Sequence, residues 1–289
     1  LHGEAVVMRL LRQNSTLRGM SQLGLDARDL KSFRKVLSLP HGIILVTGPT
    51  GSGKTSTLYT ALNEINDAVR KIITIEDPIE YQLRGVNQIQ VSEKAGLTFA
   101  RGLRSVLRHD PDVILVGEIR DRETMSAAIA YAQSGHLCLA TMHANNSYHT
   151  MNRVISFFPE EARPAFLLDM SVCLRAVVSQ RLVRGIDGNL LPAVEVMINN
   201  NRIAELIRNG QVNEIKEAME NSLSKESQTF EQSLYKLYKD GKISLDEAML
   251  NADSGKGQVL FQSDDFEVEE EGGKAAVEYV PCVDESELL

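Results

Sequence analysis

The stretch GPTGSGKTSTLY at residues 48–59 constrains the fold of this 289-residue chain more than any other feature of its sequence. It follows the apolar run IILVT and precedes a segment of helical character, so it predicts a loop between a buried strand and a helix. The spacing G-x-x-x-x-G-K-T is that of a loop whose backbone N–H groups turn inward around a polyphosphate. We expect Lys54 to reach the β- and γ-phosphates and the Thr55 hydroxyl to be a ligand of Mg²⁺. The residues expected to contact the nucleotide are Gly48, Pro49, Thr50, Gly51, Ser52, Gly53, Lys54, Thr55 and Ser56.

Strands and helices alternate on both sides of this loop. Apolar runs predict strands at 43–47, 71–76, 86–91, 113–117 and 137–142, and the intervening patterns predict helices at 26–38, 53–66, 98–108, 122–133 and 147–156. Most of these strands are runs of Ile, Val and Leu without polar alternation, which is typical of strands covered on both faces. The order therefore predicts the α/β class with a mostly parallel core sheet.

The pattern changes beyond Pro159. One long helical pattern covers 160–182, a last strand is predicted at 192–198, and short helices fill 201–251. Near the start, the apolar run AVVMRLL at 5–11 predicts a further strand. We expect four parts: a remnant of an N-terminal domain at 1–14, an α/β nucleotide-binding domain at 15–198, a C-terminal helical subdomain at 199–252 and an acidic disordered tail at 253–289.

Charge is distributed unevenly along the chain. The net charge is −8, yet residues 264–289 hold ten acidic residues against one lysine, so residues 1–263 sum to about +1. A nearly neutral body without basic and aromatic clusters argues against a nucleic-acid surface. No apolar stretch approaches the roughly 20 residues that a bilayer-spanning helix needs. The three cysteines form no CxxC pair, which favours a reducing, cytoplasmic setting.

Acidic residues follow two of the predicted strands. The run VILVG ends in Glu118, whose carboxylate can hold Mg²⁺, and Gly117 lets the chain pass close to the phosphates. The segment ITIEDPIEY brings Glu76, Asp77 and Glu80 to the end of another strand. Any of these three carboxylates could orient and deprotonate an attacking water, and the residues alone leave that choice open.

Two histidines bracket the strand predicted at 137–142. His143 follows the strand and faces the crevice in which α/β sheets bind ligands, so we interpret it as a sensor of the γ-phosphate. His136 precedes the strand. A metal site made by the two histidines is not expected, because the intervening strand would separate them by about 23 Å.

Four ordered segments carry a family resemblance. GPTGSGKT, ITIEDPIEY, FARGLRSVLRHDPDVILVGEIRD and GHLCLATMHANN resemble the Walker A loop, Asp box, Walker B motif and His box of the type II/type IV secretion and pilus ATPases. The resemblance covers residues 1–252. It implies a RecA-like P-loop core, ATP and Mg²⁺ at the site, and a homo-hexamer at the cytoplasmic face of the inner membrane. It also implies that the PAS-like N-terminal domain of the family is almost entirely missing from this chain.

The resemblance also assigns roles to individual residues. It implies that Glu76 is the catalytic base, that Glu118 is the Walker B acid contacting Mg²⁺ with Thr55, and that His143 lies near the phosphates. Arg9, in VVMRLL, matches one of two arginines that the N-terminal domain of the family presents to a neighbouring subunit's nucleotide.

The C-terminal half resembles one branch of this family. NRVISFFPEE, VVSQRLV and QTFEQSLYKLYKDGKISLDEAMLNADS are similar to the PilT/PilU-type retraction ATPases, above all the PilU-like members. The chain also lacks the four-cysteine zinc insertion that is usual in the assembly and secretion ATPases. We therefore expect a pilus retraction motor whose partners are an inner-membrane platform protein and a paralogous retraction ATPase. The alternatives are an assembly or type II secretion ATPase, an accessory ATP-binding module docked on another motor, and a nucleic-acid translocase.

Overall fold

The structure is a computed structural model, and it describes residues 3, 6, 19–23, 25–67, 69–222 and 226–253. The strands are β1 (Gly42–Thr47), β2 (Ile72–Glu76), β3 (Asn87–Gln90), β4 (Val113–Val116), β5 (Leu137–Met142), β6 (Leu174–Arg184) and β7 (Leu190–Ile198). The α-helices are α1 (Ala27–Leu37), α2 (Lys54–Ile65), α3 (Phe99–Val106), α4 (Arg122–Gln133), α5 (Ser147–Ser156), α6 (Arg163–Cys173), α7 (Asn201–Arg208), α8 (Ile215–Glu220), α9 (Phe230–Lys239) and α10 (Leu245–Asn251). The alternation predicted up to the end of α5 is confirmed.

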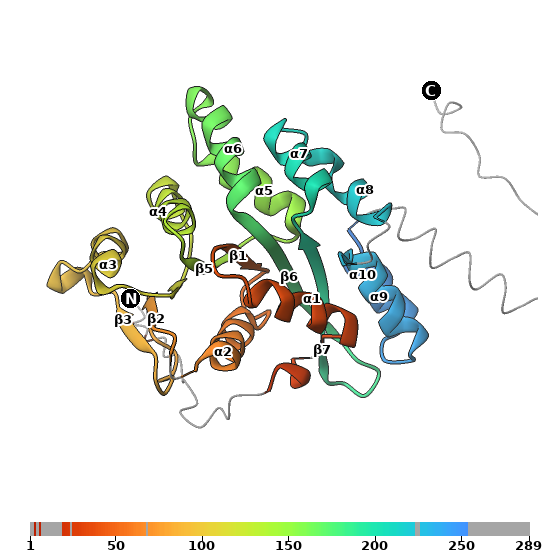
Figure 1. Ribbon diagram of the computed structural model, residues 1–289. Coiled ribbons are helices and arrows are strands. Elements are labelled where there is room, and N and C mark those ends of the chain that lie inside the picture. The colour runs from red at the N-terminus through yellow and green to blue at the C-terminus, as the bar shows by residue number, and fades with distance from the viewer. Residues whose placement is uncertain are drawn as a thin grey trace, which may run out of the picture.

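The seven strands form one sheet in the order β3-β2-β4-β5-β1-β6-β7 (Figure 1). β1 pairs in parallel with both β5 and β6, and the pairs on the β2 side of the sheet are parallel as well. β7 alone pairs antiparallel, with β6. The mostly parallel α/β fold is confirmed, and β1 delivers the phosphate loop to the carboxyl edge of the sheet between two neighbours, where such sheets bind ligands.

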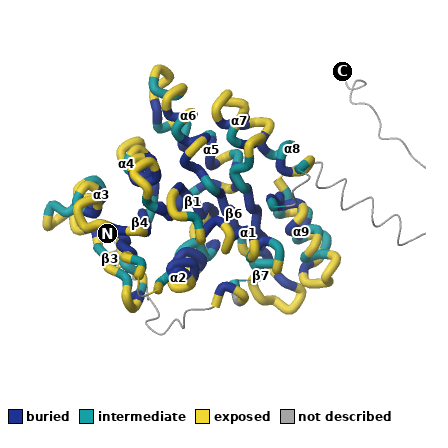
Figure 2. The backbone as a smooth tube through the Cα atoms, viewed as in Figure 1, coloured by how far each residue is buried: buried dark blue, intermediate teal, exposed yellow. Residues whose placement is uncertain are grey.

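Alternate residues of β1 supply two apolar cores. Ile43 and Leu45 belong to a core shared with helices α3 to α7, whereas Ile44 and Val46 belong to a core shared with α1 and α2. All four side chains are fully buried, and Figure 2 shows the same burial along the central strands. The period-2 alternation of a strand places successive side chains on opposite faces, so one short run holds both helical layers in place.

The segment 160–182 differs from its prediction. The helix ends at Cys173, and the chain continues as strand β6. Ala176, Val177 and Val178 are all buried, because β6 lies between β1 and β7 and is covered on both faces. A strand that is apolar on both faces lacks polar alternation, so periodicity does not separate it from the helix before it. The prediction of one long helix was wrong.

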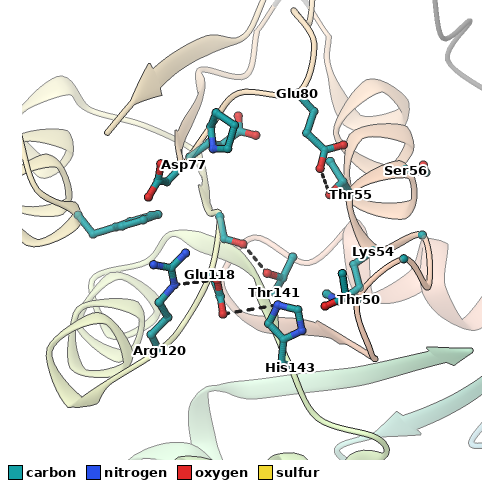
Figure 3. A pocket seen from close by; sticks show the side chains of 16 residues that line it. Thr50, Lys54, Thr55, Ser56, Asp77, Glu80, Glu118, Arg120, Thr141 and His143 are labelled. Atoms are coloured by element: carbon teal, nitrogen blue, oxygen red, sulfur yellow. Dashed lines mark hydrogen bonds and ion pairs between the residues drawn. The ribbon is translucent and has the colours of Figure 1, made fainter. Parts of the chain in front are cut away.

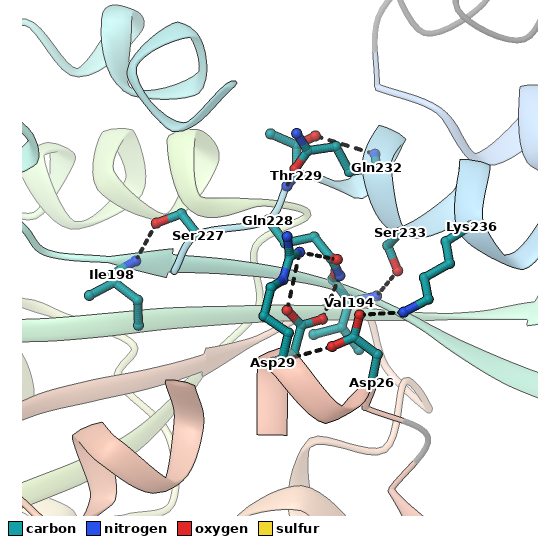
Figure 4. A network of polar contacts seen from close by, with 11 residues as sticks. Asp26, Asp29, Val194, Ile198, Ser227, Gln228, Thr229, Gln232, Ser233 and Lys236 are labelled. Atoms are coloured by element: carbon teal, nitrogen blue, oxygen red, sulfur yellow. Dashed lines mark hydrogen bonds and ion pairs between the residues drawn. The ribbon is translucent and has the colours of Figure 1, made fainter. Parts of the chain in front are cut away.

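Polar contacts join α1 to the C-terminal part (Figure 4). The carboxylate of Asp26 caps α1 by accepting from the Asp29 N–H at 2.7 Å, and it also accepts from Lys236 Nζ at 2.7 Å. Gln228 Nε2 donates to Asp29 Oδ2 at 2.6 Å and to the Val194 carbonyl at 3.1 Å. Burial raises the pKa of Asp29 to about 6. The first helix is therefore held against β7 and α9 by named polar contacts.

Some predicted features lie outside the described residues. The strand expected at 5–11 does so except for Val6, as do Arg9 and the acidic tail after Asp253. Among the helices that the structure describes, none is both long enough and apolar enough to span a bilayer.

Candidate functional site

The phosphate loop has a positive φ at three glycines, Gly48, Gly51 and Gly53, and at the first and last of these an added Cβ would also meet close neighbours. Gly48 has φ +146°, and an added Cβ there would lie 2.6 Å from Ser52 Oγ and closer still to the Gln180 carbonyl. Gly53 has φ +91° and caps the start of α2 in the left-handed region. Both glycines are therefore required by conformation and by close packing.

A cavity of about 450 Å³ opens in front of this loop (Figure 3). Its walls come from the loop, from residues 76–80 at the end of β2, from Phe99 at the start of α3, from residues 117–120 after β4, and from the end of β5. The loop residues that line it are Thr50, Gly51, Gly53, Lys54, Thr55 and Ser56. Three other residues expected to contact the nucleotide, Gly48, Pro49 and Ser52, do not line it. Five segments separated in the sequence thus meet at one polar cavity.

Lys54 lies across its own loop. Its Nζ donates to the carbonyls of Gly48 and Pro49 at 2.9 and 3.0 Å. Burial lowers its pKa, and the carboxylates of Glu118 and Glu80 oppose that effect. The ammonium is the cation of the cavity best placed to meet a polyphosphate in this loop.

Glu118 lies opposite the loop, between a cation and an imidazole. Arg120 Nε donates to Glu118 Oε2 at 2.7 Å, and His143 Nε2 lies 3.7 Å from Glu118 Oε1. Burial and the nearby Lys54 ammonium lower the pKa of His143. The imidazole is therefore neutral at pH 7, a form that can accept or donate a hydrogen bond at a phosphate.

The structure also explains Gly117 and His136, which the sequence places before Glu118 and before β5. An added Cβ at Gly117 would lie 2.8 Å from the Ile75 carbonyl, so close packing against β2 requires this glycine as well. His136 lies at the opposite end of β5, where its Nδ1 is 3.1 Å from the Tyr131 carbonyl and 3.0 Å from Ser134 Oγ. It is a structural residue of the turn after α4.

The carboxylate of Glu76 is buried and accepts three hydrogen bonds. It accepts hydrogen bonds from the Tyr59 hydroxyl, from Thr74 Oγ1 at 2.6 Å and from Gln88 Nε2 at 3.2 Å. Only 5% of the residue is exposed. Burial and the bond to Glu76 also raise the pKa of Tyr59 far above its ordinary value. Three donors hold this carboxylate in place and leave it little freedom to accept a proton from water.

Glu80 is the carboxylate of the same segment that faces the phosphate loop. Its Oε1 accepts from the Thr55 hydroxyl at 3.1 Å, and the residue is exposed at the mouth of the cavity. Figure 3 shows its carboxylate directed at the neighbouring Thr55 side chain. Of the alternatives that the sequence left open, Glu80 is the one whose side chain is both free to move and beside the expected Mg²⁺ ligand.

The structure also brings in a residue that the sequence interpretation missed. Gln180 of β6 is 5% exposed, and its amide contacts the back of the phosphate loop. The only signal in the sequence is one amide in the middle of the apolar stretch AVVSQRLV, most of which falls in the helical pattern predicted over 160–182. A helix would have placed it elsewhere.

The loop that follows His143 is anchored by a buried acid. The Ser147 N–H donates to Glu195 Oε1 at 2.7 Å, and burial raises the pKa of Glu195 to about 7. In the unfolded chain this group ionises near 4.5, so between these values the folded state binds more protons. Stability from this group is therefore present at low pH and is lost as pH rises through 7.

We expect the free energy of unfolding to fall by about 1.4 kcal/mol between pH 6 and pH 8.5 because of Glu195. The Glu195→Gln variant keeps an acceptor for Ser147 but cannot ionise, so it should lack this part of the fall. Urea unfolding of both proteins at the two pH values measures the difference. Equal losses in the native chain and the variant would contradict this assignment.

The family model described as "Type II/IV secretion system protein" matches residues 1–190. The chain belongs to this family. The resemblance found in the four motifs is thereby confirmed, although the roles of the individual site residues stay predictions.

Relatives and solved structures of this family extend the match. The chain is 50% identical over 186 residues to type II secretion system protein E of Xanthomonas campestris pv. campestris, which covers 64% of this chain and 32% of that protein. It is 42% identical over 234 residues to the type IV pilus ATPase PilU of Pseudomonas aeruginosa, covering 79% and 61%. The chain thus spans about a third of the first relative and three-fifths of the second.

Two solved structures confirm the fold. The crystal structure of the pilus retraction motor PilT with bound ADP has a TM-score of 0.77 and 38% identity, covering 85% of this chain and 70% of that one. The Legionella pneumophila ATPase DotB has a TM-score of 0.71 and 28% identity, covering 81% and 65%. The predicted P-loop α/β fold is that of these ATPases.

Proposed function

We propose that the chain is the catalytic part of an ATP-hydrolysing motor in a type IV pilus machine, acting in pilus retraction. One observation carries the ATPase assignment: Lys54, the Thr55–Glu80 pair and the Glu118–His143 pair meet in a single cavity. A solved neighbour with 38% identity, PilT, was crystallised with bound ADP.

Each side chain of the cavity has a separate role in the proposed phosphoryl transfer. The loop amides and Lys54 bind the β- and γ-phosphates and offset charge on the transferred group. Glu80 orients the attacking water and takes its proton, while Glu76 fixes the strand end from which that loop departs. His143, held beside Glu118, contacts the γ-phosphate and reports its presence to the loop before α5.

The donor set also fits Mg²⁺. The Thr55 hydroxyl and the Glu118 carboxylate line the same cavity, and both are the oxygen ligands that a hard divalent cation prefers. When bound with ATP, Mg²⁺ would offset the negative charge of the phosphates.

The extent of the similarity supports retraction over secretion. The match to PilU continues over 234 residues, whereas the match to the secretion protein ends after 186 despite its higher identity. Assembly or secretion remains the second candidate, because half the residues of that shorter match are identical. An accessory role, in which the protein binds ATP but works by docking on another hexamer, is the third. We propose a homo-hexamer at the inner membrane in each case.

Disruption of the gene in its own host separates these candidates. Loss of a retraction motor should abolish surface motility and leave more pili on the cell. Loss of an assembly motor should leave no pili, and loss of a secretion motor should retain exported proteins with normal pili. Normal motility, pili and secretion together with no phosphate release by the purified chain in Mg·ATP would reject the motor assignment.

A further inference from the structure

Gln180 lies in β6, outside the strand–loop–helix unit that makes the phosphate site. Its Nε2 donates to the Ser52 carbonyl at 2.5 Å, and its Oε1 accepts from Thr57 Oγ1 at 2.9 Å. Its own backbone carbonyl packs against Gly48. One amide therefore bridges the phosphate loop and the first turn of α2, the two segments whose N–H groups are expected to bind the phosphates.

The chemistry of these two contacts requires an amide. Ser52 offers only a carbonyl acceptor here, and the Thr57 hydroxyl donates its hydrogen, so the partner must donate at one atom and accept at the other. Leucine does neither. An ionised glutamate can only accept, and it would place its charge against the Ser52 carbonyl in a site that is 5% exposed.

The strand that carries Gln180 is fixed from its other side. The neighbouring Arg181 donates to the carbonyls of Asn251 at 2.7 Å and Asn145 at 3.0 Å, and it forms an ion pair with Asp253. Its guanidinium lies 4.0 Å from the centre of the Phe230 ring. Strand β6 is thus held by its pairing with β1 and, through Arg181, by the C-terminal helices and the loop after His143.

We propose that Gln180 is a positioning residue for nucleotide binding, which holds the phosphate loop in its binding shape from the C-terminal side of the sheet. The inference rests on the proposed function, because it concerns the same nucleotide site. Its consequence is that the affinity for nucleotide depends on an amide that no part of the sequence motif contains.

The Gln180→Leu variant should bind a fluorescent ADP analogue about tenfold more weakly than the native chain, at every pH between 6 and 9. The Gln180→Glu variant should behave differently. Burial raises the pKa of a glutamate in such a site, and the protonated acid both donates and accepts, as the amide does. Its affinity relative to the native chain should therefore approach the native value near pH 6 and fall about tenfold by pH 9.

Asn199 provides the matched control. Its Nδ2 donates to the carbonyls of Ser171 and Leu174, so Asn199→Ala also removes two amide contacts beside β6, but none to the loop. This variant should lose thermal stability and keep native affinity for ADP. The inference is wrong if Gln180→Leu binds within twofold of native, or if the relative affinity of Gln180→Glu is constant across this pH range. A native chain that binds no nucleotide overturns the proposed function as well, which separates the two failures.

Discussion

The Lys54→Ala variant is expected to bind ADP and ATP at least about a hundredfold more weakly than the native chain and to release no phosphate above background. Lys54 Nζ donates hydrogen bonds to the carbonyls of Gly48 and Pro49. Its side chain lines the same cavity as Glu80 and Glu118. Removing the ammonium leaves the phosphates facing these two carboxylates without the cation that offsets them. Isothermal titration with each nucleotide measures the loss.

Lys71→Ala is the control for this variant. It removes the same charge from an exposed lysine just before β2, at the edge of the sheet opposite the cavity. Its affinity should stay within about twofold of native, because exposed charges at such a distance are largely screened. If both lysine variants bind nucleotide as the native chain does, the phosphate site is not where the loop pattern places it.

The core of the fold could be predicted because its signals are local. The first five strands and the helices up to α5 follow from apolar runs and turn residues. β6 could not be predicted in this way. Its strand character comes from pairing with β1 and β7, which are distant in sequence, and burial on both faces removes its alternation.

The site was predictable where a short motif carries the chemistry. Lys54, Thr55, Glu118 and His143 lie around one cavity, as their positions at strand ends imply. Glu76 lines it too, but its three hydrogen-bond donors come from separate elements, so sequence could not tell a buried structural carboxylate from a reactive one. Position at strand ends therefore predicts which residues line the cavity, and the hydrogen bonds and burial distinguish Glu76 from Glu80.

The Glu80→Gln variant is expected to lower kcat for ATP hydrolysis by about 10²- to 10⁴-fold while it keeps ADP affinity within a few-fold of native. The amide still reaches the Thr55 hydroxyl, but it cannot take a proton from water. Glu80 is exposed, so the substitution should leave the free energy of unfolding nearly unchanged. Phosphate release, ADP titration and urea unfolding on the same preparation separate chemistry from binding and from folding.

Glu76→Gln is the matched variant four residues away, and it should fail for a different reason. The Glu76 carboxylate accepts hydrogen bonds from three donors, Tyr59, Thr74 and Gln88. A glutamine at this position replaces one accepting oxygen with an NH₂ group, which then faces a donor. That conflict should cost about 1–3 kcal/mol of the free energy of unfolding, since a buried polar group loses its partner. The assignment of Glu80 as the base is contradicted if Glu80→Gln keeps normal turnover. Glu76 would be the base if Glu76→Gln also keeps native stability but has no turnover. A carboxylate held by three donors would then have to release one of them during each turnover.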